Sequence, residues 1–227
     1  MAFDSYFWTP SELPRSPRID FMKFRLPNNS LEKKFKHFHN LLFSDSVIGR
    51  GIAFDQFSYS VEPQRLKVES YPWTYTIPEK LGAQSPYWKF SDELLVKARE
   101  ELQKSPITSE NLHAVTIKGA NHASALLVLQ HLASEEDVKL IVPIISSSKD
   151  TNVTYLSCKA LKKCLYNSQN YYPEVLSILR NLIFNEQEDL ENRQAAIQAL
   201  ETYNLPEVEE LLIEISQKCP DLLSATV

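Results

Sequence analysis

The stretches PEVLSILRNLI (residues 173–183) and PEVEELLIEI (residues 206–215) carry the same helical pattern of apolar residues. In each stretch, apolar side chains recur three, four and seven residues after a valine, Val175 or Val208. The same steps begin at Val138, which precedes Val175 by 37 residues, and Val208 follows Val175 by 33 residues. Such steps mark one face of an α-helix, and their recurrence every few dozen residues predicts a stacked array of helices.

The composition is that of an ordinary globular protein. Of the 227 residues, 43% are hydrophobic and 23% are charged, and both fractions are usual for folded domains. Only 4 residues are glycine, which argues against a glycine-rich phosphate-binding loop. The cysteines, Cys158, Cys164 and Cys219, form no C-x-x-C pair, so reduced thiols are expected.

Charge and hydropathy indicate which partners and which cellular locations are to be expected. The formal net charge of −5 disfavours general nucleic-acid binding. The N-terminal residues lack a basic start followed by an apolar stretch, so no signal peptide is expected. The sequence also lacks a run of about 18 apolar residues, so no membrane span is expected. We therefore expect a cytoplasmic protein without a membrane partner.

The two halves of the chain differ in chemistry. Residues 1–110 hold 18 of the 24 aromatic residues and 9 of the 13 prolines, with 15 basic and 14 acidic residues. Residues 111–227 hold 9 basic and 15 acidic residues. We predict that residues 1–110 form an aromatic, proline-rich region with about three helices and a long loop at 61–89. This region would pack as the first part of the array, and residues 111–227 would form helical repeats.

The second half is predicted to consist of paired helices. The predicted pairs are 121–134 with 136–148, 151–168 with 172–185, and 189–203 with 206–218. Asn121 is expected to cap the first helix, and Pro173 and Pro206 fit the first turns of theirs. Pro143 lies inside a predicted helix and is expected to kink it.

Small residues recur in the first helix of each predicted pair. Ala125, Ser157 and Ala196 each stand four residues before a leucine. Small side chains let two helices approach closely, so we expect them in the contact between the helices of a pair.

These pairs resemble HEAT repeats. The stretches that carry the likeness are NVTYLSCKALKKCL (152–165) with PEVLSILRNLI, and ENRQAAIQALETY (191–203) with PEVEELLIEI. Arg193 resembles the arginine of the first repeat helix, whereas Tyr155 replaces it in the preceding pair. The resemblance covers about residues 110–220 and, less closely, residues 30–60. It implies an all-α, right-handed α-solenoid of antiparallel helix hairpins, capped by the irregular, aromatic-rich N-terminal region.

The sequence shows no motif of a known active site. The patterns G-x-S-x-G, G-x-x-x-x-G-K-[ST] and G-x-G-x-x-G do not occur, and the histidines lack metal-binding spacing. Asn121 and His122 would suit a polar pair facing a ligand, but a helix start after a glycine turn explains them equally. We therefore predict no catalytic residues, no metal site and no cofactor.

An acidic segment is the first candidate for a binding surface. Between Glu186 and Glu214 there are nine acidic residues and one basic residue, Arg193. Such a surface would attract a basic partner, although a solvated face that serves solubility is the alternative. The predicted docking residues here are Glu188, Asp189, Glu207, Glu210 and Glu214.

The aromatic residues of the predicted loop are the second candidate. Trp73, Tyr75 and Trp88 are of the residue types enriched at binding hot spots. They are also suited to anchoring a long loop by packing, and the sequence does not decide between the two roles.

These observations predict a non-catalytic protein-binding module that holds one basic protein partner. An acidic solenoid of this size resembles bacterial immunity proteins, which implies that it would inhibit a toxin by occluding a basic active site. The alternative is a HEAT-like enzyme or cofactor-handling protein, similar to bilin lyases or to alkylation-repair DNA glycosylases. Such a protein is expected to show a pocket near His122, Trp73 or Trp88.

Overall fold

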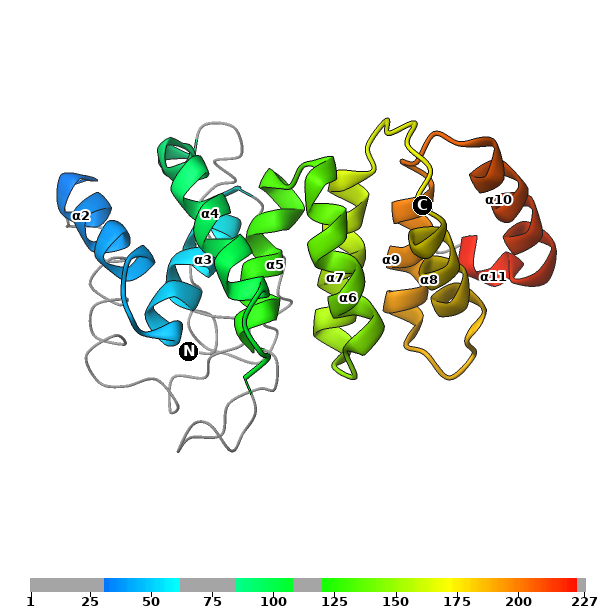
Figure 1. The fold of residues 1–227 in the computed structure, drawn as a ribbon, viewed down its shortest axis with the longest axis horizontal. Coiled ribbons are helices and arrows are strands. Elements are labelled where there is room, and N and C mark those ends of the chain that lie inside the picture. The colour runs from blue at the N-terminus through cyan, green and yellow to red at the C-terminus, as the bar shows by residue number, and fades with distance from the viewer. Residues whose placement is uncertain (1–30, 62–84, 108–119, 224–227) are drawn as a thin grey trace, which may run out of the picture. The chain divides into compact units, whose positions relative to one another are not determined.

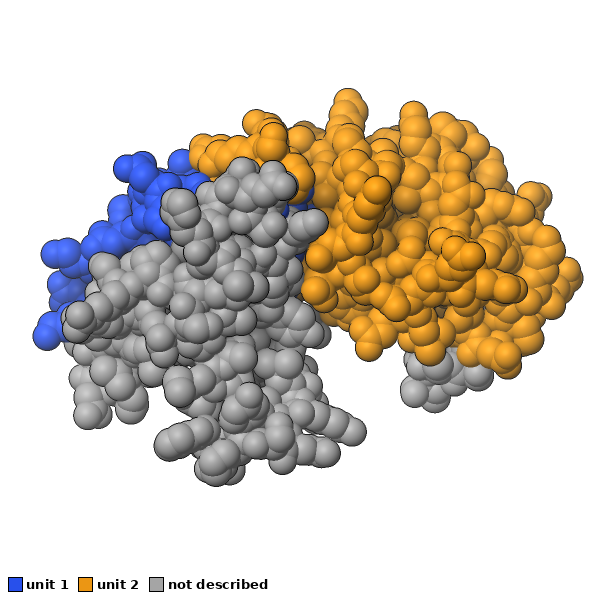
Figure 2. All heavy atoms as spheres, turned by 90° about the horizontal axis from the view of Figure 1, so that it is seen from below, with its two compact units in different colours: residues 1–98, 107–128 blue, residues 99–106, 129–227 orange. Residues whose placement is uncertain are grey.

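The structure is a computed structural model that describes residues 31–61, 85–107 and 120–223, and every regular element in these ranges is a helix (Figure 1). The chain divides into two compact units (Figure 2). Unit 1 comprises residues 1–98 and 107–128, and unit 2 comprises residues 99–106 and 129–227. The prediction of an all-α protein is confirmed for the described residues, none of whose helices is long and apolar enough to cross a membrane.

Unit 1 contains the helices of the N-terminal half. They are α2 (Leu31–Leu42), α3 (Val47–Val61), η2 (Pro86–Phe90), the start of α4 (Ser91–Leu102) and most of α5 (Ala120–Leu132). The hydroxyl of Ser46 accepts a 3.3 Å hydrogen bond from the backbone amide of Gly49, as expected of a residue that caps α3. Residues 1–30 and most of the predicted loop at 61–89 lie outside the described residues.

Aromatic side chains form the core of unit 1. Phe38, Phe54 and Phe57 are completely buried, and the ring of Phe38 stacks on that of Tyr87 at 4.8 Å. Tyr87 belongs to η2, a 3-10 helix within the segment predicted as an irregular loop. The helix forms because Pro86 occupies its first position and the hydroxyl of Ser85 caps it.

Unit 2 contains the helices of the C-terminal half. They are η4 (Glu135–Asp137), α6 (Val138–Ser147), α7 (Thr151–Cys164), α8 (Pro173–Phe184), α9 (Leu190–Leu200), α10 (Pro206–Lys218) and α11 (Pro220–Leu223). As predicted, Pro173 and Pro206 begin α8 and α10. Pro143 lies inside α6, which continues to Ser147.

The predicted apolar pattern forms the core of unit 2. The three valines that begin it, Val138, Val175 and Val208, are all buried. The remaining buried residues of the pattern are Ile141, Ile145, Leu179, Leu211 and Ile215. The other four side chains of the pattern, Val142, Ile178, Leu182 and Leu212, are half-buried.

The helices of unit 2 contact one another in a regular order. Each helix from α6 to α9 contacts the helix two places further along the chain, and α6 with α7 and α8 with α9 are also in contact. The most extensive contact joins α7 to α9, which carry the fully buried small residues Ser157, Ala160, Ala196 and Ala199. We expected small residues within each predicted pair, but this contact joins helices of different predicted pairs.

Several helix ends differ from the predicted ones. Helix α7 ends at Cys164 instead of residue 168, because the backbone of Asn167 has φ 58°, in the left-handed region that terminates helices. Helix α5 begins at Ala120, so Asn121 lies inside it, and the Oδ1 atom of Asn121 accepts a 2.9 Å hydrogen bond from the backbone amide of Ile107 instead of capping the helix.

Candidate functional site

The predicted acidic residues of α10 differ in their surroundings. Glu207 and Glu210 are exposed. Glu214 instead accepts hydrogen bonds from the guanidinium of Arg180 and, at 2.7 Å, from the ammonium of Lys218. The hydrogen bond from Arg180 contributes most to lowering the pKa of Glu214 to about 2, and that from Lys218 adds to it. The charge of Glu214 is therefore balanced within unit 2.

The other two predicted acidic residues lie at a different place. Glu188 and Asp189 immediately precede α9, whereas Glu207 and Glu210 follow its other end. Because α9 has 11 residues, about 16 Å of helix separates these two groups. The carboxylate of Glu188 also accepts a 2.6 Å hydrogen bond from the side chain of Asn192. The structure thus places the predicted acidic residues in two groups.

Of the predicted aromatic residues, only Trp88 is described, because Trp73 and Tyr75 lie outside the described ranges. Trp88 belongs to η2 and is half-buried. Its ring meets the buried ring of Phe57 edge-on, with centroids 5.2 Å apart and planes at 90°. This geometry gives Trp88 a part in the packing of unit 1.

A candidate site that the sequence patterns do not predict lies between α7 and α8. We call residues 165–172 the tyrosine loop. Tyr166 and Tyr171 are 67% and 57% exposed, although the backbone between them is tied to its surroundings. The backbone amide of Asn167, for example, donates a 3.0 Å hydrogen bond to the carbonyl of Thr202, in the turn between α9 and α10.

Glu135, in η4, fixes the middle of the tyrosine loop. Its Oε1 atom accepts a hydrogen bond from the hydroxyl of Ser168 and another, at 2.8 Å, from the side-chain amide of Asn170. Ser168 in turn accepts a 3.2 Å hydrogen bond from the backbone amide of Asn170. One carboxylate thus holds two loop residues that are 33 and 35 positions away from it.

Tyr203, in the turn before α10, fixes the end of the tyrosine loop. Its buried hydroxyl donates to the carbonyl of Asn170 and accepts a 2.8 Å hydrogen bond from the backbone amide of Tyr172. The rings of Tyr172 and Tyr203 lie 6.5 Å apart, tilted by 36°. The turns before α6 and before α10 therefore both contribute side chains that hold the loop before α8.

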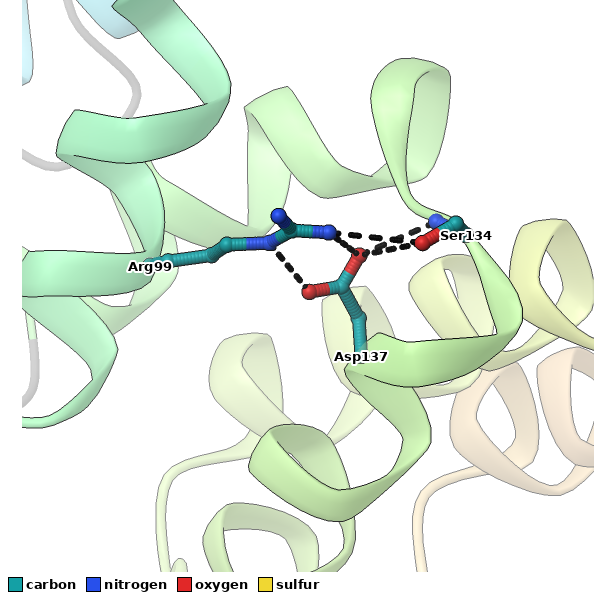
Figure 3. A network of polar contacts seen from close by, with 3 residues as sticks. All are labelled: Arg99, Ser134 and Asp137. Atoms are coloured by element: carbon teal, nitrogen blue, oxygen red, sulfur yellow. Dashed lines mark hydrogen bonds and ion pairs between the residues drawn. The ribbon is translucent and has the colours of Figure 1, made fainter.

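Asp137, two residues after Glu135 in η4, is held in place by Arg99 and Ser134 (Figure 3). The buried carboxylate of Asp137 accepts hydrogen bonds of 2.6 and 2.9 Å from the guanidinium of Arg99. It also accepts a 2.9 Å hydrogen bond from the backbone amide of Ser134. Bidentate arginine–carboxylate pairs of this kind fix orientation as well as distance, so η4 presents Glu135 in one direction.

The electrostatics of the cluster favour one protonation state. The hydrogen bond from Ser168, with a smaller contribution from Asn170, lowers the pKa of Glu135. Burial raises the pKa of Tyr203, and it raises the pKa of Tyr172 together with the charge of Glu135. At neutral pH the carboxylate is ionised and both phenols are protonated. General acid–base catalysis favours pKa values near the working pH, so these shifts suit a fixed charge and not a proton transfer.

The composition of this loop favours a turn, but the helix predicted over residues 151–168 overlaps its first residues. The segment YNSQNYY (166–172) is rich in turn-forming asparagine and serine, but the apolar pattern predicts a helix over 151–168 that includes its first three residues. The roles of Glu135 and Tyr203 depend on tertiary contacts, which no local pattern predicts.

Among the residues that the structure describes, no group of three or more histidine, cysteine, aspartate and glutamate side chains is placed to hold a metal ion. Comparisons with models of protein families, with curated proteins and with solved structures find no match for this chain.

Proposed function

We propose that this chain is a non-catalytic protein-binding module that contacts its partner through the tyrosine loop. The observation that carries the proposal is the exposure of Tyr166 and Tyr171 on a loop that Glu135 and Tyr203 hold in place.

Rigid tyrosines are well suited to protein recognition. Tyrosine offers a large contact area with few rotatable bonds, and it is enriched at the residues that dominate binding energy. A loop that is already ordered loses little conformational entropy on binding. The hydrogen bonds from Ser168 and Asn170 to Glu135 therefore support a binding role for the exposed rings beside them.

The charge of unit 2 supports a basic partner. Its described residues, 99–106 and 129–223, include 17 acidic and 10 basic residues, a formal net charge of −7. Exposed Glu207 and Glu210 contribute to this field, which would speed the encounter with a basic protein. An immunity protein that occludes a basic toxin domain in the cytoplasm is the specific form of the proposal that we favour.

We also propose that the array is an α-solenoid of HEAT-like units. The contacts of α6 with α8, α7 with α9 and α8 with α10 support this arrangement, because stacked two-helix units bring every second helix together. A solenoid would present the turns between its helices side by side at one edge. The hydrogen bonds that join the turns at Glu135, the tyrosine loop and Tyr203 agree with that expectation.

Site-specific photo-crosslinking in the cells that produce the protein tests the proposed function. A photo-reactive amino acid replaces Tyr171, and in a control it replaces exposed Lys149, which precedes the first turn of α7. Helix α7 has 14 residues, so the control lies about 20 Å from the tyrosine loop. We expect one discrete protein adduct at Tyr171 and none at Lys149.

The opposite results contradict the proposal. Equal adducts at both positions, or no adduct at Tyr171, would remove the tyrosine loop as the contact surface. The charge reversals Glu207→Lys and Glu210→Lys test the basic partner separately. They are expected to reduce the yield of the adduct at low salt more than at high salt, because salt screens exposed charges.

A further inference from the structure

The tyrosine loop holds Tyr171 and Tyr172 next to Asn170, whose side-chain amide donates a 2.8 Å hydrogen bond to the carboxylate of Glu135. The ring of Tyr203 lies 6.5 Å from that of Tyr172, and the hydroxyl of Tyr203 donates to the backbone carbonyl of Asn170. The exposure of these rings increases from buried Tyr203 through half-buried Tyr172 to exposed Tyr171. The cluster therefore reaches from the interior to the surface.

Building on the proposed protein-binding role, we propose that Tyr171, Tyr172 and Glu135, with buried Tyr203 packed behind Tyr172, form a receptor for an arginine side chain of the partner. Aromatic faces attract cations, most strongly where the cation leaves water. Arginine is the preferred cation because its planar guanidinium stacks on aromatic rings and pairs with carboxylates. No atom of the cluster needs to change its protonation for such binding.

The carboxylate of Glu135 retains capacity for a guanidinium. An ionised carboxylate offers about four acceptor positions. The structure fills two of them, through the hydroxyl of Ser168 and the side-chain amide of Asn170. A further donor from an arginine can therefore bind without breaking the hydrogen bonds that hold the loop.

The charges around the cluster also favour a cation. Glu136, Glu174 and Glu201 are exposed and lie within three residues of Glu135, Tyr171 and Tyr203 respectively. Lys162 and Lys163 approach the loop from the end of α7, but Lys162 is only half-exposed. The carboxylates thus outnumber the ammonium groups near the site, which strengthens the attraction for arginine.

The test uses the full chain and a nine-residue peptide of glycine and serine with one central arginine. In a second peptide, citrulline replaces arginine, which keeps the shape of the side chain but removes its charge. NMR signals of labelled tyrosines report binding, and tyrosine-to-phenylalanine variants assign them. We expect the arginine peptide to shift the signals of Tyr171, Tyr172 and Tyr203, and the citrulline peptide to leave them unchanged. Equal shifts with both peptides, or no shifts, would overturn the proposal.

Four variants separate recognition from folding. Tyr171→Leu removes an exposed ring but none of the hydrogen bonds of Glu135. Both Tyr171→Leu and Glu135→Gln are expected to weaken arginine binding about tenfold. Two variants serve as controls: Tyr171→Phe keeps the aromatic face, and Glu186→Gln removes a distant exposed charge. Each is expected to change the affinity less than threefold, a margin on the order of 0.6 kcal/mol. If Tyr171→Leu binds the arginine peptide as the natural chain does, the receptor is wrong.

The outcomes also separate this receptor from the proposed function. Arginine binding without a protein adduct at Tyr171 would leave the receptor intact and contradict the proposed function. A protein adduct at Tyr171 with equal binding of the arginine and citrulline peptides would support the proposed function and contradict the arginine receptor.

Discussion

The backbone amide of Tyr172 donates a 2.8 Å hydrogen bond to the phenol oxygen of Tyr203, 31 residues further along the chain. The same oxygen donates its proton to the carbonyl of Asn170. A single side chain of the turn between α9 and α10 therefore satisfies two backbone groups of the tyrosine loop. The order of that loop depends on a residue that is distant in sequence.

Replacing this hydroxyl is expected to loosen the loop. Tyr203→Phe keeps the buried ring but leaves the amide of Tyr172 and the carbonyl of Asn170 without this partner. Loss of a partner for buried polar groups costs about 1–3 kcal/mol of unfolding free energy, which urea denaturation measures. Tyr166→Phe, at an exposed hydroxyl, is the matched control and is expected to change the free energy by less than about 0.5 kcal/mol. Equal stability of the two variants would contradict the role of the Tyr203 hydroxyl in holding the tyrosine loop.

The ion pair between Arg99 and Asp137 is expected to contribute to the stability of unit 2. Asp137 is 1% exposed and Arg99 30%, so Arg99→Met leaves a buried carboxylate without its guanidinium. Breaking a buried pair costs about 3–5 kcal/mol, and the partial exposure of Arg99 reduces the expected loss to about 1–3 kcal/mol. The double variant with Asp137→Asn is expected to be less destabilised than the sum of the single changes. Additive free energies of unfolding in urea would contradict the pairing.

Glu214 is expected to make stability depend on pH. Its pKa falls from a usual value of 4.5 to about 2 in the folded chain, mainly through the hydrogen bond from Arg180. The ionised form therefore stabilises the fold fully above about pH 5, and this contribution decreases as pH falls from 4.5 toward 2. The difference in urea midpoint between the natural chain and Glu214→Gln is expected to narrow between pH 5 and pH 3. A constant difference would show that the ion pair is not responsible.

The close approach of α7 and α9 makes their small residues intolerant of enlargement. Ala196 is completely buried on α9, and Ala196→Leu is expected to destabilise unit 2 by about 1–3 kcal/mol because the added atoms overpack the contact. Gln198→Leu, at a half-buried position of the same helix, serves as the control. Thermal unfolding of the two variants compares them, and similar midpoints would argue against the α7–α9 contact.

The helices were predictable because their signals are local. The apolar steps from Val138, Val175 and Val208 predicted the buried faces, and Pro173 and Pro206 predicted two helix starts. A continuous apolar pattern with proline at its beginning leaves few alternatives to an α-helix.

The candidate site was not predictable in the same way. The loop depends on the left-handed conformation of Asn167 and on side chains from two other turns, Glu135 and Tyr203. The number of acidic residues instead favoured the acidic segment between Glu186 and Glu214 as the binding surface. The charge of Glu214, however, is balanced by Arg180 and Lys218. Composition predicts the amount of charge in a segment, but only tertiary structure shows which charges are already paired.

The affinity of the chain for the partner crosslinked at Tyr171 tests the central claim most directly. Isothermal titration calorimetry would compare the natural chain with the double variant Tyr166→Ala/Tyr171→Ala and with Leu190→Ala/Ile213→Ala, which truncates two other exposed side chains of unit 2. If the tyrosine loop is the binding surface, the first variant loses about 100-fold in affinity and the second less than about threefold. Unchanged affinity of the tyrosine variant, or a larger loss in the leucine–isoleucine variant, would contradict the account.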